Sequence, residues 1–314
     1  MPRCCGSRMQ MWSVGYRRPG GRAAGGRLFP YSTGERFLFV NRYTEGPRED
    51  IIEEERACLR WLRESIKDRR QLREAVRSRA LRWTPYQYLV GYVDFLHLKG
   101  LNVRAPTLIP RPETEEMVEY ILDSSQPVAG RHVLDLCSGS GVIAVALATK
   151  WAGCRVDLVD VSEQAMELAR ENAHLFGVES RLSFLIGAIA DQELSEESYD
   201  MVVSNPPYIP HNIVESLSRT VKDHEDLLAL DGGVDGMDVI QQVIDVSSKV
   251  LKPGGLLWME LNAETGQHEV VDSYIKQKDS SSSSLRMQLV KVVDDFRSVP
   301  RFVVLRKEGS GALV

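Results

Sequence analysis

The chain has 314 residues, of which 43% are hydrophobic and 26% charged, with a formal net charge of −5 and a pI near 5.8. This length and composition predict one large domain with a normal core and a smaller one beside it. The acidic balance argues against a broad nucleic-acid footprint, and no apolar run reaches the length of a membrane span. We therefore expect a globular protein without a membrane segment or stable nucleic-acid binding.

The cysteines give no sign of a metal site or a disulfide framework. They are five in number, and none forms a C-x-x-C pair or stands at zinc-ligand spacing with the six histidines. The expectation is reduced thiols and no metal.

Residues 1–49 are predicted to be a disordered or targeting segment. Residues 1–34 contain six arginines, no lysine and no acidic residue, and they lack both helical periodicity and core-forming content. Arginine-rich, acid-free N-termini are typical of mitochondrial transit peptides, although the glycines weaken the amphipathic helix that such a peptide forms. The segment is therefore either a mitochondrial targeting sequence or a disordered tail on a cytoplasmic protein.

Residues 50–84 are rich in charged helix formers, and their apolar residues recur at three- and four-residue steps. This pattern predicts a pair of amphipathic helices. Their outer faces carry many arginines, which either solvate the helices or meet an acidic or RNA-bearing partner, and solvation is the favoured interpretation.

Residues 85–106 are predicted to be a β-hairpin linker. Pro85 ends the preceding helix, and residues 86–103 alternate apolar and polar side chains, with glycines at 91 and 100. The prolines of the next stretch predict a stiff, extended segment, in which Thr114 caps a helix over residues 115–122. Residues 107–314 are assigned to one further domain.

A strand, glycine turn and helix follow each other over residues 133–151. The turn consists of Cys137, Ser138, Gly139, Ser140 and Gly141. Glycines at 139 and 141 let the backbone approach a ligand closely, and the helix N-terminus behind them favours a carboxylate or phosphate. This is the pattern of a nucleotide-binding unit.

The next strand, residues 155–159, ends in Asp160, where an acid can accept hydrogen bonds from both hydroxyls of a ribose. The spacing fits both an NAD enzyme and an S-adenosylmethionine (SAM) enzyme. Asp135, at the end of the first strand, favours SAM because it would repel a pyrophosphate and attract the methionine ammonium.

Asn205, Pro206, Pro207 and Tyr208, the Asn-Pro-Pro-Tyr motif, end a hydrophobic segment that cannot continue as a strand. The carbonyls of Asn205 and Pro206 and the Asn205 amide are free to accept the two hydrogens of a planar NH2 group, with the Tyr208 ring as a wall. A plain loop after a buried strand is the alternative.

The rest of the chain continues the alternation of strands and helices. We predict helices over 162–176, 237–251 and 262–278, the second ended by residues 252–255, and strands over 181–186, 200–204, 255–260, 285–292 and 301–305. This predicts an α/β fold with a mostly parallel, doubly wound sheet. Ligands bind beyond the carboxyl ends of such strands, where the turn, Asp160 and Asn205 converge.

With these motifs in place, the sequence resembles the HemK family of protein glutamine methyltransferases, which methylate the Gly-Gly-Gln loop of peptide chain release factors. The resemblance rests on residues 86–91, 108–115, 133–141, 205–209, 229–233 and 235–238, and on Asp295, Phe296 and Arg301. It implies a helical N-terminal region that recognises the protein substrate, here residues 50–84. It also implies a seven-stranded SAM-dependent methyltransferase domain of class I, here residues 107–314.

The chain departs from the family pattern in three places. Cys137 stands where the family has the first glycine of its loop, which predicts a φ below zero there. Near Ile189 the family has an acid that holds the adenine amine, whereas the nearest acid here is Asp191. The helical region over 50–84 is also short for the family.

The predicted reaction is in-line transfer of the SAM methyl group to a glutamine side-chain nitrogen. The cofactor contacts are assigned to Asp135, Cys137, Ser138, Gly139, Ser140, Gly141, Asp160, Ile189 and Asn205. The substrate is assigned to the Asn-Pro-Pro-Tyr motif, with Asn205, Pro206 and Tyr208 as the catalytic, positioning groups. No strong base is expected, because no His or Glu stands beside the motif in the sequence.

Three other functions remain open. The first two are methylation of a ribosomal-protein glutamine and methylation of an exocyclic amine of adenine or guanine. The third is binding of a release factor without activity. The acidic pI disfavours a nucleic-acid substrate, and the intact motif disfavours an inactive protein.

Overall fold

The computed structural model describes residues 48–124, 130–262, 265–279 and 285–309. The predicted targeting segment therefore lies almost wholly outside the described residues. In the described part of the chain, no helix combines the length and the apolar character needed to cross a membrane.

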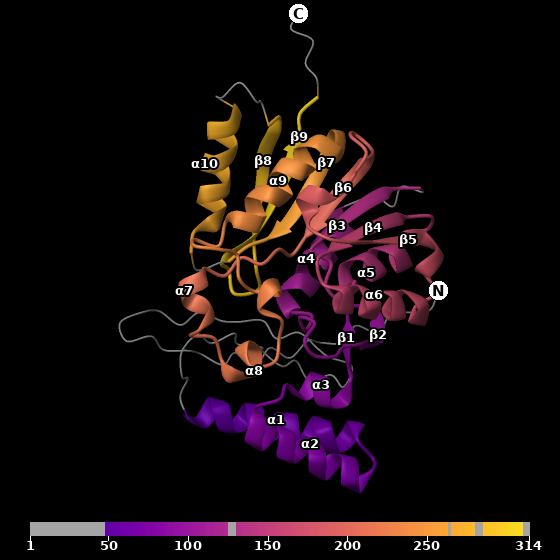
Figure 1. Cartoon of the computed structure of the whole chain (residues 1–314), viewed down its shortest axis with the longest axis vertical. Helices are drawn as coiled ribbons and strands as arrows, with labels where there is room; N and C mark the ends of the chain where they lie inside the picture. Colours follow the sequence, from indigo (N-terminus) through magenta and orange to yellow (C-terminus); the bar gives the residue numbers. More distant parts are fainter. Residues whose placement is uncertain (1–47, 125–129, 263–264, 280–284, 310–314) are drawn as a thin grey trace, which may run out of the picture.

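The predicted helical pair is confirmed as α1 (Arg48–Ser65) and α2 (Arg69–Arg82), which lie below the sheet in Figure 1. Asp68 caps α2, since its Oδ1 accepts hydrogen bonds from the backbone N–H groups of Arg70 and Gln71 at 3.0 and 2.8 Å. Buried Cys58, Leu62 and Ala75 form a small apolar cluster between the helices. The pair thus has a core of its own.

The hairpin begins later than the alternation predicted. Residues 86–90 form a short helix, α3 (Tyr86–Val90), and the hairpin consists of β1 (Tyr92–Phe95) and β2 (Leu98–Asn102). Pro85 precedes the helix, and Gly91 ends it with a φ of 89°, which only glycine adopts readily. The Tyr88 hydroxyl also donates a 2.6 Å hydrogen bond to the carbonyl of Thr107. The short helix α3 therefore takes the place of the strand that was expected over residues 86–90.

Seven strands form one sheet in the order β5-β4-β3-β6-β7-β9-β8. Their bounds are β3 (His132–Leu136), β4 (Arg155–Asp160), β5 (Leu182–Ile186), β6 (Tyr199–Ser204), β7 (Leu251–Glu260), β8 (Met287–Asp294) and β9 (Pro300–Lys307). Strand β9 pairs antiparallel with both of its neighbours, β7 and β8, and the other described strand pairs of this sheet are parallel. The α/β, mostly parallel, doubly wound fold is confirmed, and the strand order reverses between β3 and β6.

Helices cover both faces of the sheet, as the alternation of side chains along β3 requires. Val133 belongs to a core cluster with α4 (Pro112–Ser124), α5 (Val142–Lys150) and α6 (Glu163–Leu175). Leu134 and Leu136 point the other way, into a cluster with α9 (Asp238–Val250) and α10 (Gln267–Asp279). Ser162 caps α6 by accepting a hydrogen bond from the Ala165 N–H at 3.3 Å.

Three predicted boundaries are wrong. Helix α4 begins at Pro112, so Thr114 lies inside it, buried, and is not its cap. Proline is tolerated in the first turn of a helix, where its missing N–H has no partner to lose. Strand β7 begins at Leu251, so residues 252–255 belong to the strand, and α10 begins at Gln267 rather than at residue 262.

The segment after β6 returns across the hairpin linker. It carries two short helices, α7 (His211–Val214) and α8 (Arg219–Lys222), which Figure 1 shows between the sheet and the helical pair. The Asp226 N–H donates to the carbonyl of Pro106 at 2.7 Å, and His224 Nε2 lies 2.7 Å from the carbonyl of Arg82. This segment therefore contacts both the linker and α2.

Candidate active site

Asp135 lies at the end of β3 with a fully buried side chain. Its Oδ2 accepts a 3.2 Å hydrogen bond from the Ala144 N–H in α5, whereas its Oδ1 has no hydrogen-bond partner among the described residues. Burial raises the pKa of this carboxyl well above its ordinary value. A buried carboxyl oxygen in this position fits a cationic ligand, which would donate a hydrogen bond to Asp135 Oδ1.

The turn after β3 corrects one prediction. Cys137 has a φ of +60°, not a negative value, so a residue with a Cβ occupies the left-handed region. That conformation costs a non-glycine residue about 1 kcal/mol. The next residue holds the turn in place, because the Ser138 N–H and hydroxyl both donate to the carbonyl of Val159, at 3.2 and 3.3 Å. Burial raises the pKa of the Cys137 thiol, so the thiol stays protonated.

Both glycines of the turn have positive φ, but their surroundings differ. A Cβ on Gly141 would lie 2.8 Å from the Cβ of Ala169, so this glycine allows α5 and α6 to approach each other. A Cβ on Gly139 would meet no atom of the described residues within 4 Å. The backbone at Gly139 therefore borders open space. Ser140 is buried, and its carbonyl accepts a 3.0 Å hydrogen bond from Asn172 Nδ2.

Asp160 lies where the sequence predicted, at the end of β4 beside the turn. Its Oδ2 accepts the Gly139 N–H at 2.8 Å, and its Oδ1 accepts the Ser162 N–H at 2.9 Å. Burial raises the pKa of Asp160, and these backbone hydrogen bonds oppose that rise. The carboxyl is fixed in position and keeps lone pairs for further donors, such as two ribose hydroxyls.

Ile189 follows β5 on a short 3-10 helix, Ile189–Asp191, and is buried. The Gly187 N–H donates to the carbonyl of Asp160 at 2.9 Å, so this segment lies directly beside Asp160. Asp191 is exposed. The structure thus brings Ile189 to the same edge of the sheet as the turn.

The Asn-Pro-Pro-Tyr motif lies at that edge as well. Ser204, the last residue of β6, pairs with Leu136 of β3, and its hydroxyl donates to the carbonyl of Leu136 at 2.8 Å. Asn205 therefore follows directly beside Cys137. Pro206 and Pro207 are buried, whereas Asn205 and Tyr208 are half-buried. The two predicted sets of residues converge at the carboxyl ends of the central strands.

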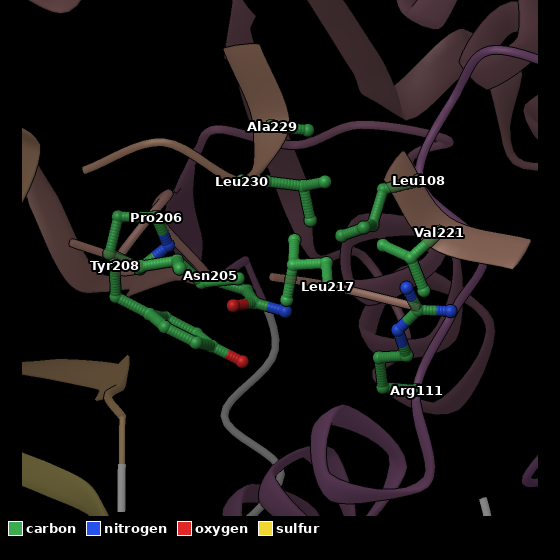
Figure 2. A pocket seen from close by; sticks show the side chains of 10 residues that line it. Leu108, Arg111, Asn205, Pro206, Tyr208, Leu217, Val221, Ala229 and Leu230 are labelled. Carbon is green, nitrogen blue, oxygen red and sulfur yellow. The ribbon is translucent and has the colours of Figure 1, made fainter. Parts of the chain in front are cut away.

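A pocket opens beside the motif, and Figure 2 shows Asn205 and Tyr208 along one side of it. The remaining lining is mostly apolar and comes from Leu108, Arg111, Pro206, Ile209, Leu217, Val221, Ala229 and Leu230. The Arg111 guanidinium is neutralised by buried Glu225, whose two oxygens accept hydrogen bonds from Nη2 at 2.8 and 2.6 Å. A narrow apolar pocket with a polar Asn205 suits a short side chain that ends in an amide or amine.

Comparison with known proteins identifies the family. Residues 118–286 match the family model described as the methyltransferase small domain. The chain is 37% identical to the release factor glutamine methyltransferase of Gloeobacter violaceus, over 75% of this chain and 76% of that protein. It is 34% identical to the human MTRF1L release factor glutamine methyltransferase, over 79% of this chain and 75% of that one. The chain belongs to the release factor glutamine methyltransferase family.

The family uses SAM as its cofactor, and the residues of this methyltransferase fit it. The unpaired Oδ1 of Asp135 suits the methionine ammonium, and the open space at Gly139 admits the methionine end of the cofactor. Asp160 suits the ribose hydroxyls. These are the groups that the sequence assigned to the cofactor.

One residue of the methyltransferase site was missed. Glu260, the last residue of β7, is 1% exposed, and its Oε1 accepts a 3.0 Å hydrogen bond from the Tyr208 hydroxyl. The expectation that no Glu stands beside the motif is therefore wrong in space, although it holds along the sequence. Strand β7 pairs with β6, with Ser204 opposite Met259. The carboxylate at the end of the predicted strand over residues 255–260 was therefore the sequence feature that could have placed Glu260 in the site. Burial raises the pKa of Glu260 to about 7, and Arg301 opposes that rise.

Thr114 was placed at a helix cap and belongs to the site instead. Its hydroxyl donates to Glu260 Oε2 at 2.8 Å and accepts from Asn205 Nδ2 at 3.0 Å. Nothing local predicts this role, because α4 reaches the site only in the folded chain.

Proposed function

We propose that this methyltransferase methylates the side-chain nitrogen of the glutamine in the Gly-Gly-Gln motif of a peptide chain release factor. The observation that carries the proposal is the position of Asn205, a polar group in an otherwise mostly apolar pocket, next to the turn that fits SAM. The names of the curated relatives support a release factor as the substrate.

The chain's residues act mainly by positioning. An amide nitrogen is a poor nucleophile, because its lone pair is delocalised into the carbonyl. Hydrogen bonds from the acceptor NH2 to Asn205 Oδ1 and to the Pro206 carbonyl hold the amide plane and stabilise charge that develops on the nitrogen. The Tyr208 ring forms a wall beside that plane. When bound, SAM would supply a methyl group whose bond to the sulfonium sulfur breaks as the bond to nitrogen forms, so no strong base is needed before transfer, and one N–H proton leaves the nitrogen for solvent afterwards.

The apolar lining serves the same purpose. Leu108, Leu217, Val221 and Leu230 exclude water from the pocket, which strengthens the hydrogen bonds to the acceptor amide. Because Arg111 and Glu225 form an ion pair, they add no net charge to the wall of the pocket. The aliphatic part of a glutamine side chain matches these walls.

The helical pair over residues 50–84 is proposed to recognise the release factor, since the segment that follows the motif contacts α2 through His224. The methyltransferase domain is proposed to span 107–314, with the hairpin over 85–106 as linker.

The arginine-rich, acid-free residues 1–34 support a mitochondrial location. A fluorescent fusion of the full chain tests this. Mitochondrial fluorescence that is lost on deleting residues 1–34 is expected, and a diffuse signal from the full chain would contradict it.

The substrate is tested by incubating the purified protein with labelled SAM and, separately, a release factor, ribosomal proteins and DNA. Label is expected on the release factor alone. Label on a ribosomal protein or on DNA, with none on the release factor, would replace the proposal with one of the other two substrate classes. Label on no substrate would favour a binding protein without activity.

A further inference from the structure

A chain of hydrogen bonds runs from the end of β7 to the acceptor pocket. Its members are Glu260, Thr114 of α4 and Asn205, which come from three separate parts of the sequence. The Thr114 hydroxyl is 2.8 Å from Glu260 Oε2, and Asn205 Nδ2 is 3.0 Å from that hydroxyl. Thr114 and Glu260 are 3% and 1% exposed, so bulk water does not compete for these bonds.

The donor and acceptor groups of these three side chains allow only one arrangement of the hydrogen atoms along the series of hydrogen bonds. An ionised carboxylate can only accept hydrogen bonds, so the single hydrogen of the Thr114 hydroxyl must point to Glu260. Toward Asn205, that hydroxyl can then only accept. Asn205 must therefore present its NH2 to Thr114, which leaves its Oδ1 as the end that is available to a ligand in the pocket.

We infer that Glu260, acting through Thr114, fixes the orientation of the Asn205 amide and thereby determines that Asn205 offers an acceptor to the pocket. This rests on the proposed function, because the direction matters only for a substrate that brings an NH2 group. A reversed Asn205 would set its own NH2 against that of the glutamine, and the hydrogen bond would be lost. Glu260 is a positioning residue, since it acts on the substrate through two other side chains.

The surroundings of Glu260 support this role. Its second oxygen accepts from the Tyr208 hydroxyl, so each carboxylate oxygen has one donor and Tyr208 is held by the same group. Burial disfavours the ionised form of Glu260, the positive charge of Arg301 favours it, and the negative charge of Glu113 adds to the effect of burial. Arg301 is itself fixed, as its Nη1 donates to the carbonyl of Leu261 at 3.0 Å.

The test compares substitutions that keep shape but change hydrogen-bond direction. Glu260→Gln can donate to Thr114, which frees Asn205 to reverse, and Thr114→Val breaks the chain at its middle. Both are expected to lower kcat on the release factor by about tenfold or more, with KM and the Kd for SAM changed by less than about twofold. Thr114→Ser keeps the hydroxyl and is expected to retain most of the wild-type kcat.

A combined variant separates a directed chain from two independent structural effects. Thr114→Val/Glu260→Gln is expected to lose no more kcat than Thr114→Val alone. Without the Thr114 hydroxyl, Glu260 is no longer connected to Asn205 by hydrogen bonds, so changing Glu260 has no further effect on Asn205. Losses that multiply, or a Glu260→Gln variant with wild-type kcat, would overturn the inference. If Glu260→Gln fails to fold, equal kcat in Thr114→Val and Thr114→Ser would overturn it as well. A wild-type enzyme that leaves release-factor glutamine unmodified would instead refute the proposed function.

Discussion

The hydroxyl of Tyr208 lies 3.0 Å from Glu260 Oε1, so a hydrogen bond joins the last residue of the Asn-Pro-Pro-Tyr motif to the last residue of the neighbouring strand β7. The sheet register brings this about, because Ser204 of β6 pairs with Met259 of β7. Both strands end at the same level, and the motif that follows β6 packs against the carboxylate that ends β7. The site is therefore built by two strand ends and α4, not by the motif alone.

Asn205→Ala is expected to abolish most methyl transfer while it lowers SAM affinity only modestly. The expected loss is about 2 to 4 kcal/mol of transition-state stabilisation, the usual cost of removing one preorganised polar group from an active site. Tyr208→Phe keeps the ring and loses only the bond to Glu260, so its effect should be smaller. Single-turnover rates on a purified release factor measure both. A larger loss in Tyr208→Phe than in Asn205→Ala would reverse the assigned roles.

Activity is expected to depend on pH through Glu260. Since burial raises its pKa to about 7, with Arg301 opposing and Glu113 adding to the rise, the carboxyl gains a proton as the pH falls through that value. A protonated Glu260 can donate to Thr114 and no longer fixes the direction of Asn205. Thus kcat should fall below about pH 7 and level off above it. The Glu260→Gln profile should lack this step, and an unchanged step in that variant would assign the titration to another group.

Asp160→Ala is expected to weaken SAM binding by about 1 to 3 kcal/mol, because charge-assisted hydrogen bonds to the ribose hydroxyls are lost. Glu163→Ala is a matched control, since Glu163 is an exposed acid in the first turn of α6. Titration calorimetry measures both. Equal affinity in Asp160→Ala and the wild type would show that another group holds the ribose.

The two glycines of the turn should respond differently to alanine. Gly141→Ala places a Cβ 2.8 Å from that of Ala169, in addition to the strain of a φ of +73°, and should destabilise the fold by about 2 to 4 kcal/mol. Adding Ala169→Gly should recover part of that loss. Gly139→Ala meets no atom of the part of the chain that the structure describes within 4 Å, so it should reduce SAM affinity much more than thermal stability. Urea unfolding with parallel SAM titrations distinguishes the two, and equal losses of stability would contradict this account.

Local pattern was sufficient for the parts of the fold and site that depend on neighbours in sequence. The strand, turn and helix around Gly139, and Asp160 at the next strand end, follow from periodicity and turn chemistry, and the structure places them as predicted. Thr114 and Glu260 could not be assigned in this way, because their roles arise from contacts across 146 residues of sequence. The positive φ of Cys137 was not predicted either, because a residue with a Cβ favours a negative φ.

Mass spectrometry of the Gly-Gly-Gln peptide from a purified release factor, after a single turnover with SAM, tests the central claim most directly. The account predicts one added methyl group, located on the glutamine side chain, with the wild-type enzyme. It predicts almost none with Asn205→Ala, although that variant still binds SAM. An unmodified glutamine after reaction with the wild type, or full methylation by Asn205→Ala, would contradict the account.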